Sequence, residues 1–151
     1  MASQPARPRP PNADAEEHAR LRTLLLDYFA AFNRADLDAV QARLHPDFRF
    51  DRGSWPPLEG PDEFAGFYRD LWSRTTEAVG LDSTWWDGAW LHADLRVDLT
   101  VHEDCPTFPG GPLLHGETIV GARNRLRYRF VDGLLHTIVD ESPEPDLAPP
   151  D

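Results

Sequence analysis

Two long segments in the second half of the chain alternate apolar and polar residues, and this pattern constrains the fold more than any other feature. In the segment Trp90–His102 every second residue is apolar and the residues between are polar or charged. The alternation returns in Thr118–Phe130, where arginine occupies alternate positions over Arg123–Arg129. Successive side chains of a strand point to opposite faces. Both segments therefore predict long strands with one apolar and one charged face.

The first half of the chain predicts three helices. Asp14 and Glu17 have the spacing of a capping box, so we expect a long helix to begin at Asp14. Asp36 is expected to cap a second, short helix, and Pro61 suits the first position of a third. The long helix carries one apolar stripe, with residues recurring every three or four positions: Leu21, Leu24, Leu25, Tyr28, Phe29 and Phe32.

The order of the elements predicts an α+β domain. Between the second and third helices, Phe48–Arg52 alternates as a strand, and the glycines and prolines of Gly53–Gly60 indicate a turn. After the two long strands, Asp132-Gly133 indicates a tight hairpin and Leu134–Asp140 a final strand. We expect the helices to pack on one face of a curved antiparallel sheet.

Composition limits the number of domains and the kinds of partner. A chain of 151 residues that is 40% hydrophobic fits one globular domain. Prolines crowd both ends, so we expect a disordered tail over residues 1–12, one domain over 13–142 and a proline-rich tail over 143–151. The net charge of -11 argues against binding to nucleic acid or to an anionic membrane.

The absence of lysine and the presence of one cysteine exclude Schiff-base chemistry and a disulfide within the chain. All 15 basic residues are arginine, so no lysine can form a Schiff base. Cys105 is the single cysteine, and residues 1–18 lack the apolar run of a signal peptide, so we expect a cytoplasmic protein without a disulfide within the chain. The segment His102–Cys105 and His115 lack the spacing of a metal site, and we expect neither a metal nor a cofactor.

The segment YFAAFNRADLDAVQARLHPDFRF, followed by LEGPDEFAGFY and a long meander, resembles the SnoaL-like branch of the nuclear transport factor 2-like superfamily. The resemblance spans residues 16–142. It implies a conical, cystatin-like fold in which a curved sheet wraps around a long N-terminal helix, with further helices on the concave face and a homodimer as the expected assembly. Members include ketosteroid isomerases, polyketide cyclases and limonene-type epoxide hydrolases, so the motifs indicate the fold better than the reaction.

The resemblance implies roles for single residues. Tyr28 matches the helix tyrosine with which the isomerases donate a hydrogen bond to the dienolate oxygen. The isomerase base falls on Arg52, and the acid of the isomerase oxyanion hole falls on Leu126, as does the acid/base aspartate of the cyclases. Asp140 keeps the position of an aspartate near the end of the family fold, and His136 shares its strand face. We expect Asp140 to be a base or acid and His136 its proton-sharing neighbour.

The epoxide hydrolases provide the closest local match. Their arginine and two aspartates correspond to Arg96-Val97-Asp98 and to Asp140, which lies seven residues after Gly133. One carboxylate takes a proton from water, the other gives a proton to the epoxide oxygen, and the arginine orients both. Two residues that hold the water in that family fall on Phe50 and Arg52.

A structural interpretation of the same strand stays open. If the apolar residues of Trp90–His102 face the pocket, the charged face points to solvent. Asp94 and Asp98 then lie across from the arginines of Arg123–Arg129 as cross-strand ion pairs. A single β-bulge would exchange the two faces.

We therefore predict an enzyme with an enclosed hydrophobic pocket that performs cofactor-free acid/base chemistry on a hydrophobic small molecule. Cyclisation, isomerisation and epoxide hydrolysis are compatible with this prediction, on a polyketide- or terpene-like substrate of natural-product biosynthesis. A non-catalytic ligand-binding or dimerisation module is the alternative, because Tyr28 can be a core residue and His136 and Asp140 an exposed strand end. The residues expected to line the pocket are Phe50, Arg52, Asn124, Leu126, Tyr128 and Trp72.

Overall fold

The structure is a computed structural model that describes residues 11–142. Along the chain the elements are α1 (Pro11–Asn33), α2 (Leu37–Ala42), β1 (Leu44–Arg52), β2 (Trp55–Glu59), α3 (Gly60–Arg74), β3 (Thr75–Trp86), β4 (Leu91–Val101), β5 (Thr118–Val131) and β6 (Leu134–Asp140). Residues 1–10 and 143–151 of the two predicted tails lie outside the described residues. Among the described helices, none combines the length and the apolar character needed to cross a bilayer.

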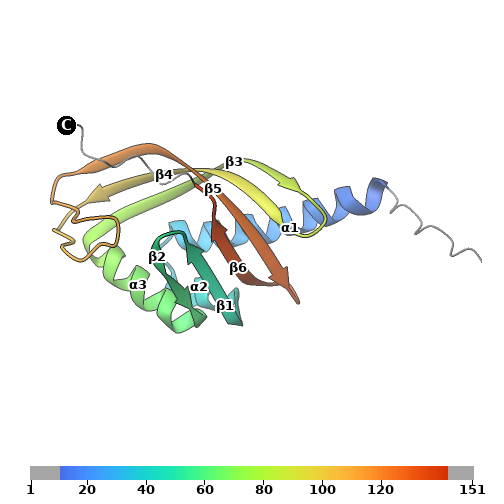
Figure 1. The fold of residues 1–151 in the computed structure, drawn as a ribbon, viewed down its shortest axis with the longest axis horizontal. Coiled ribbons are helices and arrows are strands. Elements are labelled where there is room, and N and C mark those ends of the chain that lie inside the picture. The colour runs from blue at the N-terminus through green and yellow to red at the C-terminus, as the bar shows by residue number, and fades with distance from the viewer. Residues whose placement is uncertain (1–10, 143–151) are drawn as a thin grey trace, which may run out of the picture.

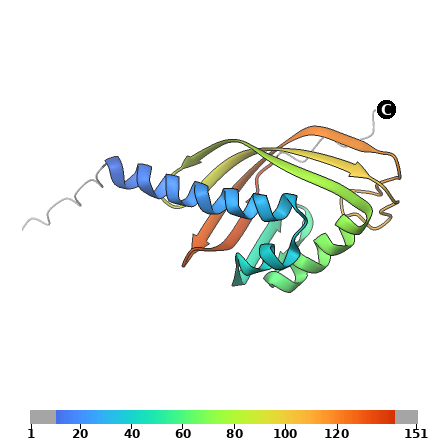
Figure 2. The ribbon, with the colours of Figure 1, turned by 180° about the vertical axis from the view of Figure 1, so that it is seen from behind.

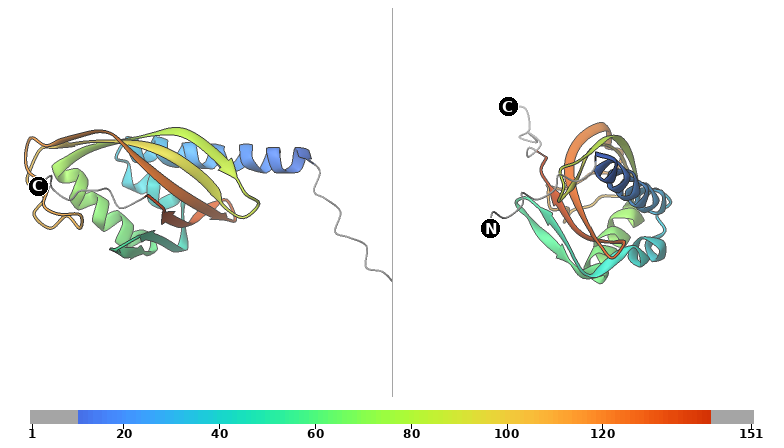
Figure 3. Two further views of the ribbon diagram at one scale, coloured as in Figure 1. Left: turned by 45° about the horizontal axis from the view of Figure 1, so that its top comes forward. Right: turned by 90° about the vertical axis from the view of Figure 1, so that its right-hand side faces the viewer.

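Six strands form one curved sheet in the order β2-β1-β6-β5-β4-β3. The long strands β3, β4 and β5 arch over α1 (Figure 1), which runs along the concave side when the molecule is seen from behind (Figure 2). Seen along its length, the sheet curls around the helices (Figure 3). The predicted α+β class is confirmed by this arrangement.

Neighbouring strands pair antiparallel except for β1 and β6, which run parallel. The hairpin at Asp132-Gly133 returns β6 beside β5, and the free edge of β6 then meets β1. Both hairpin residues have positive φ, at 54° and 77°, and glycine tolerates this conformation without strain. The parallel pair thus joins the β1–β2 hairpin to the expected meander of β3–β6.

Several elements differ from those expected, among them β1, which begins at Leu44 instead of Phe48. The helix α1 begins at Pro11 instead of Asp14, because proline suits the first helical turn and leaves Asp14 to interact with the helix dipole. The expected turn Gly53–Gly60 contains the strand β2, whose prolines are tolerated because β2 is an edge strand. The strand β3 was not predicted, since few of its residues are apolar.

The core lies between the concave face of the sheet and the helices. The alternating apolar residues of β4 other than Val97 are buried there, with Leu91 and Ala93 inaccessible to solvent. Phe64 on α3 is also inaccessible, and its ring centroid lies 5.3 Å from that of Phe48 and 4.6 Å from that of Tyr68. Aromatic packing of this kind fixes the helices against the strands.

The helix α1 is attached to the edge strand β3 at two points. The side chain of Asn33 donates to the backbone oxygen of Val79 at 2.9 Å and accepts from its backbone nitrogen at 2.8 Å. Toward the other end of the helix, Nε2 of His18 lies 2.8 Å from Oγ1 of Thr84. Asn33 thus satisfies both backbone polar groups of Val79 on a strand that has only one neighbour in the sheet.

Replacing Asn33 with alanine is expected to lower the free energy of unfolding by about 1 kcal/mol, because two hydrogen bonds to Val79 are lost and water replaces them only in part. Urea unfolding measures the change. Thr23→Ala on the exposed face of the same helix is the control, and no loss is expected there. Equal stability of Asn33→Ala and the unaltered chain would show that Asn33 does not hold β3.

Candidate functional site

Arg96 and Asp98 project from the outer face of the sheet. The Nε atom of Arg96 lies 2.8 Å from Oδ1 of Asp82, and Oδ1 of Asp98 accepts a hydrogen bond from the backbone nitrogen of Gly121 at 2.7 Å. Both side chains are exposed. Among the described residues, no hydrogen bond or ion pair joins either of them to Asp140. The geometry corresponds to the outward, structural interpretation of this strand.

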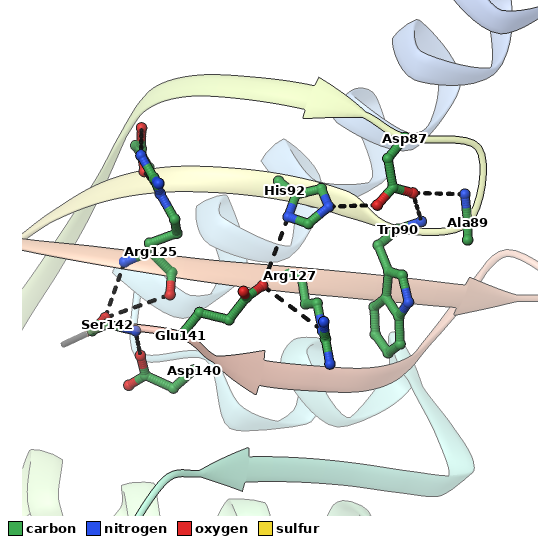
Figure 4. A network of polar contacts seen from close by, with 10 residues as sticks. Asp87, Ala89, Trp90, His92, Arg125, Arg127, Asp140, Glu141 and Ser142 are labelled. Carbon is green, nitrogen blue, oxygen red and sulfur yellow. Dashed lines mark hydrogen bonds and ion pairs between the residues drawn. The ribbon is translucent and has the colours of Figure 1, made fainter. Parts of the chain in front are cut away.

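A polar network on the same outer face joins the β3–β4 hairpin to the chain after β6 (Figure 4). Nε2 of His92 lies 2.7 Å from Oδ2 of Asp87, and its Nδ1 lies 3.7 Å from Glu141. Glu141 also faces Arg127, at 3.8 Å from Nε. The bond from His92, with two backbone amides of the turn, lowers the pKa of Asp87 to about 2. Asp87, His92 and Glu141 each contact another group of the network, whereas Nε of Arg127 is buried and makes no hydrogen bond within the described structure. We assign the network to stabilising the hairpin.

Asp140 lies directly opposite Leu126, whose side chain is buried in the core. Directly opposed residues share a sheet face, so Asp140 belongs to the concave side. Its Oδ1 accepts from the backbone nitrogen of Ser142 at 2.8 Å, and Oγ of Ser142 lies 3.2 Å from Oδ1 of Asn124. The structure thus brings Asp140 and Asn124 together through Ser142.

His136 does not join this group. The pairing of β5 with β6 is irregular at this point: Arg129 lies opposite Thr137 and Phe130 opposite Leu135, which leaves His136 as an extra residue. A bulge of this kind turns a side chain away from its regular face. In the described part of the chain, no hydrogen bond or ion pair joins His136 to Asp140.

Three tyrosines lie buried inside the cone. Tyr28, Tyr68 and Tyr128 are 3%, 9% and 1% exposed, and their hydroxyl groups make no hydrogen bond with another described residue. Phe64 packs against the first two, with its ring centroid 6.5 Å from that of Tyr28 and 4.6 Å from that of Tyr68. Burial raises the pKa of all three well above the usual value. They therefore stay protonated at physiological pH and can donate hydrogen bonds.

A glutamate on β3 lies beside these tyrosines. Glu77 is opposite the buried Leu99, so its side chain turns to the concave side, where Nε1 of Trp72 donates to its Oε1 at 3.1 Å. Burial raises the pKa of Glu77 to about 7, although the bond from Trp72 opposes the shift. The charge on Glu77 in turn helps to raise the pKa of Tyr28 and Tyr68. At neutral pH this carboxyl group can both accept and release a proton.

Glu77 is reached from the surface through a pocket of about 200 Å³ between the end of α1, the end of α3 and the start of β3. The pocket is open to solvent, and Trp72 forms part of its wall. Its lining residues are Asn33, Arg34, Ala35, Trp72, Thr75, Thr76 and Glu77. A titratable group near neutrality in a pocket is a physically motivated functional candidate.

The other residues expected to line a pocket lie mostly in the core. Phe50 and Leu126 are buried. Arg52 donates from Nε and Nη2 to the backbone oxygen of Pro56 at 3.0 and 2.6 Å, and its guanidinium lies 4.6 Å from the ring centroid of Phe67. Its Nη1 is buried without a hydrogen-bond partner in the described structure. Burial lowers the pKa of Arg52, because removing part of the guanidinium from water destabilises its charged form.

Sequence reasoning missed Glu77. The segment Thr75–Trp86 contains glycine, serine, threonine and aspartate, which resemble a loop. One signal was present: Glu77, Val79 and Leu81 alternate, which would place a carboxyl group on the apolar face of a strand.

Comparisons with known proteins identify the family and the fold. The family model of the SnoaL-like domain matches residues 25–135, which is most of the chain. The chain belongs to the SnoaL-like family. No curated protein matches it in sequence.

Solved structures with a similar fold cover about four fifths of this SnoaL-like protein. A candidate polyketide cyclase from Xanthomonas campestris pv. campestris has 26% identity and a TM-score of 0.70, over 82% of this chain and 90% of that one. A candidate polyketide cyclase from Pseudomonas putida KT2440 has 22% identity and a TM-score of 0.67, over 80% and 89%. An epoxide hydrolase of the limonene type from M. tuberculosis has 16% identity and a TM-score of 0.64, over 82% and 83%. The expected NTF2-like fold is thereby confirmed.

Proposed function

We propose that this SnoaL-like protein catalyses proton transfer on a small hydrophobic carbonyl compound without a cofactor, and that Glu77 is the group that moves the proton. The observation that carries the proposal is the position of Glu77, which lines a pocket, receives a hydrogen bond from Trp72 and lies close enough to Tyr28 and Tyr68 to influence their pKa values. A base with a pKa near the working pH combines the correct protonation state with the largest driving force for transfer.

The tyrosines supply the second part of the chemistry. When a base removes a proton next to a carbonyl group, negative charge develops on the carbonyl oxygen and needs a hydrogen-bond donor. Tyr28 and Tyr68 remain protonated because burial and the charge on Glu77 raise their pKa values. Either hydroxyl can therefore stabilise an enolate. In an isomerisation Glu77 returns the proton to another carbon. In an aldol-type cyclisation the enolate carbon attacks a second carbonyl group of the substrate, and Glu77 gives the proton to the alkoxide oxygen that forms.

The pocket limits what can bind. A volume of about 200 Å³ is smaller than the roughly 300 Å³ at which drug-sized sites begin. We infer that the reacting part of the substrate enters, while the rest lies against the exposed rim formed by Arg34 and Thr76. The aromatic residue Trp72 in the wall favours a flat, unsaturated ring, which agrees with the cyclases among the similar structures.

Deuterium exchange tests the proposal without knowledge of the natural substrate. The protein is incubated with 2-tetralone in D₂O, and loss of the α-proton signal is followed by NMR. We expect exchange faster than in buffer, rising with pH through about 7 as Glu77 ionises. Glu77→Gln is expected to reduce the enzymatic rate by about 10²- to 10⁴-fold, the usual contribution of a general base.

Two variants serve as controls for this experiment. Glu103→Gln removes an exposed carboxylate, and Arg96→Gln removes an exposed arginine of the outer face. Both should exchange at the rate of the unaltered protein. Exchange that survives in Glu77→Gln would refute the proposed role. Opening of limonene oxide that is lost in Asp98→Asn would instead favour the epoxide hydrolase arrangement.

A further inference from the structure

A second group of chemically active side chains lies far from Glu77 in the sheet. One potential ligand atom from each of His45, Asp47 and His136 lies within 4.8 Å of the other two. These residues belong to β1 and β6, which β5 and β4 separate from β3. We propose that His45, Asp47 and His136 form a binding site for a divalent transition-metal ion of the zinc class.

The irregular pairing of β1 with β6 gathers the three residues. Leu44 lies opposite Leu135 and Arg49 opposite Thr137, so the four residues His45–Phe48 face the single residue His136. The extra residues of β1 therefore form a bulge in that strand. On its other side, in the pairing of β6 with β5, His136 is itself an extra residue. The two imidazole rings consequently meet with their centroids 4.7 Å apart.

One nitrogen on each ring makes no hydrogen bond with another described residue. Nδ1 of His136 lies 2.8 Å from Oγ1 of Thr137, which leaves Nε2 for an ion and orients the ring, as the outer partners of metal-bound histidines do. Nδ1 of His45 accepts from the backbone nitrogen of Asp47 at 3.0 Å. His45 can bind through Nδ1 in place of that bond, or through Nε2 once the proton has moved to Nδ1. Either way of binding the ion breaks the hydrogen bond from the backbone nitrogen of Asp47 to Nδ1 of His45.

The ligand types select the ion. Two imidazoles and one carboxylate suit zinc and its neighbours, whereas calcium and magnesium prefer oxygen ligands alone. Both histidines are partly buried and Asp47 is exposed, so an ion can enter from solvent and keep water as a fourth ligand. The net charge of -11 also attracts cations.

Calorimetric titration of the full chain with zinc chloride at pH 7.5 tests the site. We expect one zinc ion per chain. His45→Gln and His136→Gln should each weaken binding by at least about 10-fold, the scale on which even outer partners of metal ligands act. Asp47→Asn alters only an exposed side chain, so it should keep the fold while binding zinc more weakly.

A matched control and a spectroscopic readout make the result decisive. His115→Gln removes an exposed histidine elsewhere in the chain and should leave zinc affinity unchanged. NMR spectra of the ring nitrogens should show zinc-induced shifts at His45 and His136 alone. No stoichiometric binding, or equal losses in His115→Gln and Asp47→Asn, would overturn the proposal. Zinc binding does not involve Glu77, so Glu77→Gln should bind zinc normally whatever its exchange activity.

Discussion

Glu77→Gln is expected to raise the free energy of unfolding at pH 8 by up to about 3 kcal/mol, because the pKa of Glu77 rises from 4.5 to about 7 on folding. Glutamine has the shape of the protonated acid and can still accept the hydrogen bond from Trp72. The variant therefore avoids the cost of holding a charge beside buried aromatic rings. A gain in stability together with a loss of activity is typical of a functional site.

The direction of the pH dependence follows from proton binding. Between pH 4.5 and about pH 7 the folded chain holds a proton on Glu77 that the unfolded chain has released. Stability from this group is therefore complete below pH 4.5, falls as pH rises through this window, and levels off above about pH 7. The difference between Glu77→Gln and the unaltered chain should follow the same course, close to zero at pH 4.5 and largest at pH 8.

Urea unfolding at several pH values between 4.5 and 8 measures this difference. Glu103→Gln is the matched control, since it removes an exposed carboxylate, and its effect should stay within about 0.5 kcal/mol at every pH. A constant difference between Glu77→Gln and the unaltered chain across the range would contradict the raised pKa of Glu77. It would then also remove the main support for Glu77 as a base.

Phe64→Ala is expected to lower the free energy of unfolding by about 3 to 5 kcal/mol, because it removes an inaccessible aromatic ring and leaves an apolar cavity. The ring of Phe64 packs against Phe48, Tyr28 and Tyr68, so three elements lose contact at once. The loss is a large fraction of the stability of a domain of this size.

Thermal and urea unfolding measure the effect of Phe64→Ala. Leu114→Ala is the control, because Leu114 is 54% exposed and its truncation should cost less than about 0.5 kcal/mol. A loss below about 1 kcal/mol in Phe64→Ala would indicate that the surrounding rings collapse into the space. In that case the aromatic interior is less rigid than its packing suggests.

The fold could be predicted because its pattern is repetitive. The apolar stripe of α1 and the alternation in β4 and β5 each involve many residues, so single exceptions do not obscure them. Parallel pairing of β1 with β6 could not be predicted in this way, since the two strands are far apart in the sequence and their pairing depends on the path of the whole chain. The strand β2 was hidden by Pro56 and Pro57, which only an edge position tolerates.

The site was harder to predict for a physical reason. Asp140 and Tyr28 are placed on the concave side, as the family resemblance implies, but strand bulges move single side chains and no local pattern marks them. One bulge takes His136 away from the face of Asp140 and brings it to His45. Glu77 gains its properties from burial by distant elements, which a single sequence does not reveal.

The parallel pair of β1 and β6 makes folding of this domain non-local. Leu44 can pair with Leu135 only after β3, β4 and β5 have been synthesised. Closing the chain segment between the two residues lowers the conformational entropy before any contact between β1 and β6 offsets the cost. Until then β1 has only the short β2 beside it. On the ribosome, the N-terminal half therefore emerges with one edge of β1 unpaired and with the aromatic face of α1 uncovered. The sheet cannot be completed before β6 is available, so we expect folding to begin only after nearly the whole domain has been synthesised.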